Sequence, residues 1–474
     1  MTGVMIMKLP NLREAKVRGQ SEVSYIEAEI KRDLSLFKGR KYYLKTYGCQ
    51  MNVHDSELIA NLLEGIGFIE TDKMEGSDLV ILNTCAIREN AHDKVFGFLG
   101  RCKHEKELTP EMMICVCGCM AQEPSVCEEI LSKHPYIDLV FGTHNIHELP
   151  NLLLNCTGKT EIEVESKEGD VVENLEYTRD SKIEAWVNIM YGCDKFCTYC
   201  IVPYTRGKQR SRKSSCILRE VENLAKEGYK EVTLLGQNVN AYGKDLEDEL
   251  SFAELLLKVS DTGIPRIRFV TSHPWDFSDE LIDTIASRDN IMPYIHLPLQ
   301  SGSSRILKLM GRRYTKEEYL NLFEKIKTRI PNVAVTTDII VGFPGETEKD
   351  FEDTLEMVKR CKYDNAFTFI FSPRIGTPAE NLPDETPKEE KERRLARLNE
   401  LVNFYSLEAN KKYVGRTVDV LITGKSDRGS DKIAGYTDTM KLVNVTGPVD
   451  AIGKTIAVKI TEAKSFSLNG EVEL

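Results

Sequence analysis

Alternation of strand-like and helix-like segments is the feature that most constrains how this chain of 474 residues can fold. Between residues 41 and 156, helix-like runs such as 54–66 and 88–107 follow strand-like runs. The strand-like runs cover residues 41–46, 78–83, 112–116 and 137–141. Repetition of this kind is typical of an open parallel sheet, so we predict an α/β domain here.

The same alternation resumes in residues 185–412. Six strand-like segments occur there, at residues 186–190, 231–235, 266–271, 294–297, 333–340 and 366–371. Six units are fewer than the eight of a complete barrel, so we predict an incomplete (β/α)6 barrel. Residues 386–412 carry leucines at helical spacing and are expected to close this domain as an amphipathic helix.

Three stretches lack this pattern. Residues 1–38 contain no sustained apolar run and are interpreted as an extension, and residues 157–184 are polar and charged, which indicates a linker or an exposed hairpin. In residues 413–474, Val and Ile alternate with polar residues between glycines, which predicts a small antiparallel β-barrel. The sequence therefore predicts an α/β multidomain protein with segments 1–38, 39–156, 157–184, 185–412 and 413–474.

Cysteine usage indicates a cytoplasmic protein. The chain has 13 cysteines, no signal peptide that we can identify, and no apolar run approaching the length of a membrane helix. In a reducing compartment, clustered cysteines are more often metal ligands than disulfides.

Cys193, Cys197 and Cys200 form a C-x3-C-x2-C triplet directly after a strand-like run. Soft thiolates select iron–sulfur clusters or zinc. Structural zinc usually takes four ligands, and a redox dithiol at Cys197 and Cys200 would not need Cys193. We interpret the triplet as the ligands of three irons in a four-iron cluster, with the fourth iron left open.

The triplet and the strand ends around it resemble those of the radical S-adenosylmethionine enzymes. Glycine- and proline-containing segments lie at the ends of four of the predicted strands. Residues 234–240, 271–274 and 296–303 end three of them, and residues 337–347 span the end of the fifth strand and its turn. Ligands of such barrels bind at the carboxyl ends of the strands. The resemblance implies that an electron from the cluster cleaves S-adenosylmethionine and that the resulting 5′-deoxyadenosyl radical removes a hydrogen atom. The predicted cofactor-binding residues are Tyr199, Gly236, Gln237, Asn238, Ser272, Gln300 and Asp338. We assign no catalytic acid or base beyond the cluster ligands.

A second set of three cysteines follows predicted strands in the first α/β domain. Cys49, Cys85 and Cys119 each lie just past the carboxyl end of a strand, the edge where open sheets bind ligands. Position alone leaves a structural role open for them, because buried cysteines are common. We accept the structural role for the other seven, Cys102, Cys115, Cys117, Cys127, Cys156, Cys216 and Cys361.

A cysteine-bearing α/β domain, a radical-cluster domain and a small β-barrel in this order resemble the methylthiotransferase family from residue 41 onward. The resemblance implies an auxiliary [4Fe-4S] cluster on Cys49, Cys85 and Cys119, in addition to the radical [4Fe-4S] cluster. It also implies that residues 413–474 form an RNA-binding TRAM module. One departure is local: Lys208-Gln209 stands where the family is expected to have a basic residue followed by Glu.

The motifs around Cys49 and Cys85 favour the family members that modify an isopentenylated adenosine of tRNA. The implied substrate is an anticodon loop whose adenosine 37 carries an isopentenyl group on N6, and the implied product carries a methylthio group at C2. Two equivalents of S-adenosylmethionine are expected, one as methyl donor and one as radical source. Other implied partners are an electron donor such as flavodoxin or ferredoxin and a sulfur or cluster donor. No membrane partner is expected, and a monomer is expected.

A basic run follows the triplet although the formal net charge of the chain is −11. Residues 195–213 contain no acid, and Arg206, Lys208, Arg210 and Arg212 are the predicted RNA contacts. A solvated basic loop, or a role in folding the cluster loop, is the alternative interpretation.

Other functions share parts of this pattern. The nearest alternative is a methylthiotransferase acting on a threonylcarbamoyl-adenosine tRNA or on a ribosomal protein aspartate. A non-catalytic iron–sulfur redox protein would need the clusters but not the glycine-rich strand ends. An RNA-binding protein with structural zinc is the third alternative.

Overall fold

The structure is a computed structural model that describes residues 25–27, 33, 35–86, 89–156, 158–164, 170–427, 429 and 432–473. Two compact units divide the chain, and each is described by itself. The first unit comprises Met1–Asp180, Met190–Asp194 and Cys200–Arg212. The second comprises Ser181–Ile189, Lys195–Tyr199 and Lys213–Leu474. Among the helices of the described residues, none combines the length and the apolar character needed to cross a bilayer.

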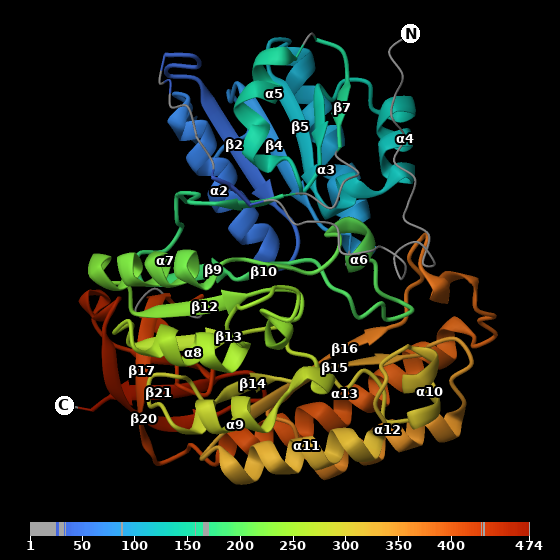
Figure 1. Cartoon of the computed structure of the whole chain (residues 1–474), viewed down its shortest axis with the longest axis vertical. Helices are drawn as coiled ribbons and strands as arrows, with labels where there is room; N and C mark the ends of the chain where they lie inside the picture. The colour runs from blue at the N-terminus through green and yellow to red at the C-terminus, as the bar shows by residue number, and fades with distance from the viewer. Residues whose placement is uncertain are drawn as a thin grey trace. The chain divides into compact units, whose positions relative to one another are not determined.

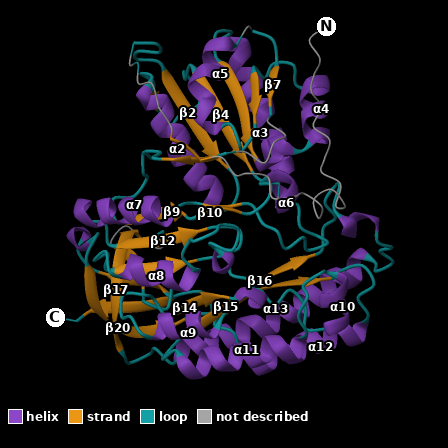
Figure 2. Cartoon of the chain, in the orientation of Figure 1, coloured by secondary structure: helices purple, strands orange, loops and turns teal. Residues whose placement is uncertain are grey.

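The first unit is built on a parallel sheet of six strands in the order β3-β2-β4-β5-β6-β7 (Figures 1 and 2). The strands are β2 (Lys41–Thr46), β3 (Ile69–Glu70), β4 (Leu79–Thr84), β5 (Met113–Gly118), β6 (Leu139–Phe141) and β7 (Glu161–Glu163). The four strands predicted for residues 41–156 are confirmed, and every pair in the sheet is parallel.

Helices cover both faces of this sheet, which is why its central strands read as continuous apolar runs. Helices α2 (Gln50–Gly65) and α5 (Leu149–Asn155) pack on the face that carries Leu79 and Ile81. Helices α3 (Glu89–Leu108) and α4 (Pro124–Lys133) pack on the face that carries Val80 and Leu82. Successive side chains of β4 therefore point alternately into two separate hydrophobic cores, one on each face of the sheet.

The prediction of a linker for residues 157–184 is wrong for two short strands. Strand β7 extends the sheet by pairing with β6, and β8 (Val171–Glu173) is buried and pairs in parallel with β1 (Tyr25–Glu27). Their acidic residues suggested exposure. Glu173 is instead buried because its carboxylate pairs with the Arg212 guanidinium at 2.9 Å.

The second unit contains the six strands predicted for the partial barrel. They form two three-stranded parallel sheets, ordered β13-β12-β9 and β14-β15-β16. The strands are β9 (Glu184–Asn188), β12 (Glu231–Leu235), β13 (Arg266–Phe269), β14 (Tyr294–His296), β15 (Ala334–Val341) and β16 (Asn365–Ile370). A single bridge from Ile267 to Ile291 continues the hydrogen bonding beyond β13.

Helices alternate with these strands, as the sequence predicts. They are α7 (Ser214–Glu227), α8 (Phe252–Ser260), α9 (Asp279–Ala286), α10 (Ser304–Leu309), α11 (Lys316–Arg329), α12 (Glu348–Cys361) and α13 (Lys388–Lys411). Reciprocal capping boxes fix where α8, α11 and α12 begin. Helix α13 confirms the amphipathic helix predicted for residues 386–412.

The carboxyl-terminal residues form a closed barrel in the order β17-β18-β19-β21-β20. Its strands are β17 (Thr417–Lys425), β18 (Lys432–Tyr436), β19 (Leu442–Thr446), β20 (Thr455–Ala463) and β21 (Leu468–Val472). Alternate residues such as Val420 and Ile422 fill the interior. The predicted barrel is confirmed, but it is not wholly antiparallel, because β19 and β21 pair in parallel.

Charged side chains of β12 and β13 form a buried cluster, which also contacts backbone carbonyl groups of the residues that follow β18. Arg266 and Arg268 share Glu231, with N–O distances of 2.9 and 2.8 Å, and Arg268 also donates to the Thr437 carbonyl at 2.7 Å. Glu184 pairs in register with Glu231 on the neighbouring strand. Burial, followed by repulsion from Glu231, raises the pKa of Glu184 to about 7.

We expect the effect of Glu184→Gln on the free energy of unfolding to be more favourable near pH 8 than near pH 4. The folded state raises the pKa of Glu184 from 4.5 to about 7, so its contribution to stability is complete below pH 4.5 and is lost as pH rises through about 7. Urea unfolding across this range should show the variant gaining on the parent protein by at most about 1.4 kcal/mol per pH unit. If the difference in unfolding free energy between the variant and the parent protein does not change with pH, the raised pKa of Glu184 is contradicted.

Candidate cysteine centres and cofactor-binding strand ends

Cys49, Cys85 and Cys119 lie at one edge of the first unit's sheet. Cys49 is the N-cap of α2, Cys85 follows β4, and Cys119 begins the short 3-10 helix η1 (Cys119–Gln122) after β5. Strands β2, β4 and β5 are neighbours and parallel, so their carboxyl ends coincide. The structure therefore places these three cysteines, which are far apart in the sequence, at one edge of the sheet, as predicted. Their role as cluster ligands stays a prediction.

Two glycines allow the backbone segments at this edge to approach each other. Gly48 has φ +143°, and a Cβ there would lie 2.7 Å from the Cβ of Cys85. Gly118 has φ +93°, and a Cβ there would overlap the carbonyl oxygen of Thr84. A side chain at either position would push two cysteine-bearing segments apart.

Two asparagines tie the strand ends together. The Asn52 amide donates to the Thr84 carbonyl at 2.9 Å, and the Asn83 amide donates to the Asn52 carbonyl at 2.8 Å. The Thr84 hydroxyl donates to the Cys117 carbonyl at 2.5 Å, which extends the network to β5. The sequence interpretation did not identify these asparagines as supporting residues, although each lies within three residues of a predicted ligand.

The local electrostatics favour a thiolate at Cys49. A hydrogen bond from Cys85, helped by the positive charge of Arg206, lowers the pKa of Cys49 to about 5 against the effect of burial. Burial raises the pKa of Cys119, and Arg206 partly offsets that rise. Thiolates are the metal-binding form of cysteine, so the electrostatics favour metal binding at Cys49, whereas burial opposes it at Cys119.

The remaining buried cysteines behave differently. Burial raises the pKa of Cys115 and Cys117 well above the ordinary value and that of Cys361 to about 11. Thiols of this kind are inert members of the core, in keeping with the structural role predicted for them.

No three His, Cys, Asp or Glu side chains in the described part of the chain converge closely enough to share one metal ion. A four-iron cluster makes a different demand, because each thiolate binds its own iron and the sulfurs stay further apart. The fit of Cys49, Cys85 and Cys119 to a cluster therefore depends on their common sheet edge and their chemistry.

The second triplet follows β10 (Met190–Tyr191), and its members lie within eight consecutive residues. In the first unit, the Cys193 amide donates to the Gly207 carbonyl at 3.2 Å. Gly192 has φ +69°, and a Cβ there would overlap the Lys208 carbonyl. The loop before Cys193 is therefore packed closely against the segment that follows Cys200.

In the second unit, Cys197 is buried beside Arg312. The Arg312 guanidinium donates to the Cys197 sulfur at 3.5 Å and to the Pro298 carbonyl at 3.1 Å. The Thr198 amide donates to the Met310 carbonyl at 2.9 Å, which anchors the loop at the end of α10. Arg312 was not predicted from the sequence, because its partner is distant along the chain.

The predicted cofactor residues follow the strands of the second unit. Gly236, Gln237 and Asn238 follow β12, and among the described residues no hydrogen-bond partner reaches the buried side-chain oxygens of Gln237 and Asn238. The Asn238 amide donates to Asp276 at 2.8 Å, so its oxygen has a fixed direction. Unsatisfied buried polar atoms of this kind suit a polar ligand.

Further predicted cofactor residues lie after β13 and β14 and within β15. The Ser272 hydroxyl donates to the His296 carbonyl at 2.5 Å, and Asp338 lies 3.2 Å from the His296 Nε2 atom. Gln300 has φ +69° and bridges to Ile339. The Tyr199 ring packs edge to face against Phe343, with centroids 6.5 Å apart. Cofactor binding by these residues stays a prediction.

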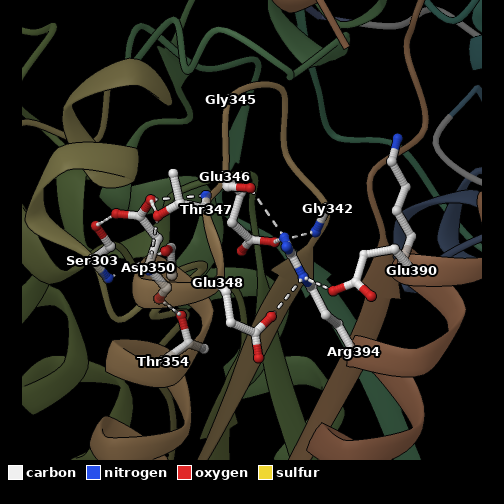
Figure 3. Close-up of polar contacts among 12 residues, drawn as sticks. Ser303, Gly342, Gly345, Glu346, Thr347, Glu348, Asp350, Thr354, Glu390 and Arg394 are labelled. Atoms are coloured by element: carbon white, nitrogen blue, oxygen red, sulfur yellow. Dashed lines mark hydrogen bonds and ion pairs between the residues drawn. The ribbon is translucent and has the colours of Figure 1, made fainter. Parts of the chain in front are cut away.

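A buried arginine holds the turn after β15 (Figure 3). Arg394, on α13, donates to the Glu346 carboxylate at 2.9 Å and to Glu390 at 2.8 Å. Glu346 in turn accepts the Gly342 amide at 2.6 Å. Next to this turn, the Asp350 carboxylate accepts the Ser303 hydroxyl at 2.6 Å and also caps α12. The turn is therefore pinned to α13 and to the segment after β14.

The four predicted RNA contacts are placed differently from one another. Arg206, Arg210 and Arg212 are buried, whereas Lys208 is partly exposed. Arg206 pairs with Asp55 at 2.6 Å and Arg212 with Glu173 at 2.9 Å. Their RNA contact stays a prediction, but these two guanidinium groups are already engaged by carboxylates of the same unit.

Family models match three parts of the chain. The model described as the radical SAM superfamily matches residues 187–358. The model described as uncharacterized protein family UPF0004 matches residues 41–142, and the TRAM domain model matches residues 411–472.

Curated relatives match nearly the whole chain. A tRNA-2-methylthio-N(6)-dimethylallyladenosine synthase from Bacillus pumilus (strain SAFR-032) is 55% identical over 467 residues, which cover 98% of this chain and 92% of the relative. Synthases of the same name from Bacillus subtilis (strain 168) and Geobacillus kaustophilus (strain HTA426) are 53% and 54% identical, each over 98% of this chain and over 92% and 88% of the respective relative.

Among solved structures, the radical S-adenosylmethionine methyltransferase TsrM from Kitasatospora setae has a similar fold. Its structure with cobalamin and a [4Fe-4S] cluster bound gives a TM-score of 0.52 at 15% sequence identity, covering 72% of this chain and 74% of that chain. At this identity the likeness concerns the fold alone.

We expect Gly118→Ala to destabilise the first unit more than Gly76→Ala does. Gly76 has φ +77° and open space around it, so alanine there costs about 1–2 kcal/mol. Gly118 has φ +93° and ψ −166°, a region essentially limited to glycine, and its new Cβ would also overlap the Thr84 carbonyl. Urea unfolding and iron content after anaerobic reconstitution would measure the effect. Equal losses in the two variants would contradict the close-approach argument.

We expect Arg394→Met to lower the free energy of unfolding by about 3–5 kcal/mol, because it leaves the Glu346 carboxylate buried and unpaired. Arg397→Met is the matched control on the same helix, since Arg397 pairs with Glu348 and Glu352 near the surface. That control should cost less than about 1 kcal/mol. Denaturant unfolding of both variants would show whether burial makes this difference.

Proposed function

This chain belongs to the family of tRNA-2-methylthio-N(6)-dimethylallyladenosine synthases, and from this membership we propose that it catalyses the reaction of that name. The observation that carries the proposal is 53–55% identity along 98% of the chain. The substrate is adenosine 37 of a tRNA anticodon loop with an isopentenyl group on N6. The product carries a methylthio group in place of the C2 hydrogen.

The six cysteines divide the chemistry between two centres. Cys193, Cys197 and Cys200 would hold the radical [4Fe-4S] cluster, and Cys49, Cys85 and Cys119 would hold the auxiliary one. When bound, these clusters and two equivalents of S-adenosylmethionine supply the electron, the hydrogen-abstracting radical, the sulfur site and the methyl group. The chain supplies thiolates, hydrogen-bond donors and a fixed geometry.

The first unit positions the auxiliary ligands. Asn52 and Asn83 hold the ends of β2 and β4 together, so the distance between Cys49 and Cys85 is fixed before a cluster binds. The low pKa of Cys49 provides one thiolate at neutral pH without help from a metal.

The second unit positions S-adenosylmethionine. The buried, unsatisfied oxygens of Gln237 and Asn238 would accept hydrogen bonds from its polar groups, and the Tyr199 ring, which packs against Phe343, would contact its adenine. Gly236, Ser272, Gln300 and Asp338 complete the binding surface, with Asp338 oriented by His296. Arg312 fixes the Cys197 side chain from the same unit.

RNA is bound by the TRAM barrel and by Lys208 of the loop that follows Cys200. We assign RNA contact in residues 195–213 to Lys208, which is partly exposed, and a folding role to Arg210 and Arg212, which are buried. The barrel contributes shape more than charge, because lysines and arginines balance acids in residues 413–474.

The remaining partners follow from the reaction. A flavodoxin or a ferredoxin supplies electrons, and a separate donor supplies sulfur or cluster. The protein acts in the cytoplasm as a monomer and without a membrane partner.

Anaerobic reconstitution should give about eight irons per chain, the sum of two four-iron clusters. Incubation with isopentenylated tRNA, S-adenosylmethionine and a reductant should then give the methylthio nucleoside by mass spectrometry. Cys197→Ala should abolish deoxyadenosine formation, whereas Cys361→Ala, which alters a core cysteine of α12, should not. Product on a threonylcarbamoyl-adenosine tRNA or a ribosomal protein alone would overturn the proposed substrate.

A further inference from the structure

Arg206 is a buried cation that contacts a predicted cluster ligand. Its Nε–H donates to the Cys119 sulfur at 3.1 Å, and its Nη2–H donates to the Asp55 carboxylate at 2.6 Å. Arg206 is only 4% exposed. A guanidinium does not lose its proton in proteins, so the sulfur of Cys119 faces a permanent positive charge.

Asp55 fixes the direction of this guanidinium. It lies on α2, the helix that Cys49 caps, and it is buried as well. One helix therefore carries both an auxiliary ligand and the anchor of Arg206. Arg210 also donates to the Arg206 carbonyl at 3.0 Å, so the backbone of Arg206 is held at the same time as its side chain.

The segment that brings Arg206 to Cys119 begins at a ligand of the other triplet. Cys200 is followed by the short helix α6 (Val202–Thr205), and Arg206 closes that helix through its amide, 2.8 Å from the Val202 carbonyl. Ile201 and Tyr204 pack in one buried cluster with Ala86 and Cys119. The residues after Cys200 thus form part of the wall around the auxiliary cysteines.

Tyr204 adds a second polar group to that wall. It is 5% exposed, and its hydroxyl has no hydrogen-bond partner among the described residues. Tyr204 packs in the same buried cluster as Cys119, so its unsatisfied hydroxyl is a further polar group of this wall.

We propose that Arg206 is a positioning residue of the auxiliary centre, which donates to the Cys119 sulfur and so raises the reduction potential of the cluster bound there. Hydrogen bonds to cluster sulfurs, together with net charge, set such potentials, and a fixed cation favours the reduced, more negative form. The inference rests on the proposed function, which places an auxiliary cluster on Cys49, Cys85 and Cys119. It assigns Arg206 to the cluster rather than to RNA.

A purely structural role for the Arg206–Asp55 pair is the competing explanation. It predicts lost stability but an unchanged potential. Arg212→Gln is a matched control, because Arg212 is also buried, lies in the same loop and pairs with the buried Glu173. Arg206→Lys is the conservative variant, which keeps the charge but loses the planar fork of donors.

The full-length protein and four variants, Arg206→Gln, Arg206→Lys, Arg212→Gln and Cys119→Ala, would be reconstituted anaerobically, and their iron content measured. A redox titration monitored by electron paramagnetic resonance would then measure the reduction potential of the auxiliary cluster. The signal of that cluster is the one that Cys119→Ala removes. At a fixed potential, Arg206→Gln should shift the ratio of reduced to oxidised auxiliary cluster at least tenfold toward the oxidised form, equivalent to about 59 mV for one electron. Arg206→Lys should shift it less, and Arg212→Gln should leave it unchanged.

An Arg206→Gln variant that loads fully and titrates like the Arg212→Gln variant would overturn the inference alone. If Arg206→Gln loses about four irons while Arg212→Gln keeps all of them, Arg206→Lys decides: a lowered potential of its auxiliary cluster supports the inference, and an unchanged potential overturns it. Equal iron loss in both variants would point to the loop as a whole and overturn it. Absence of iron on Cys49, Cys85 and Cys119 in the parent protein would instead overturn the proposed function.

Discussion

Neighbouring parallel strands end at the same edge of a sheet, and the chemistry proposed for this protein depends on that constraint. Cys49, Cys85 and Cys119 are separated by more than thirty residues each, yet β2, β4 and β5 are adjacent and bring them to one edge. The same rule places the segments after β12 and β13 together in the second unit. Side chains then refine what the sheets provide: Asn52 and Asn83 lock the first edge, and Arg394 pins the turn after β15.

Buried arginines are the second recurring device. Arg206, Arg268 and Arg394 each bind a buried carboxylate and, with the same guanidinium, a second group such as a sulfur or a carbonyl. Such pairs are costly to break, because the remaining charge stays buried without a partner. They therefore suit positions where a loop must keep one conformation, and all three connect segments far apart in the sequence.

Local pattern predicted most strands, the closing helix and the carboxyl-terminal barrel, because periodicity records which face of an element is buried. It also predicted that Cys49, Cys85 and Cys119 would meet, since only strand order was needed. It failed where burial depends on a distant partner. The sequence around Arg206 suggests a surface cation, because its partner Asp55 lies 151 residues earlier in the chain. Strand β8 reads as linker for the same reason, because Arg212 neutralises Glu173.

The path from Cys200 to Arg206 affects how substitutions in the radical triplet should be interpreted. Helix α6 and the packing of Ile201 join Cys200 directly to the wall around Cys119, so a change at Cys200 that loosens this segment also removes a donor from the auxiliary centre. Cys197 belongs to the other unit, where Arg312 and the end of α10 hold its loop. A substitution at Cys197 is therefore expected to affect the radical centre with less effect on the auxiliary centre than a substitution at Cys200, although both cysteines serve the same proposed cluster.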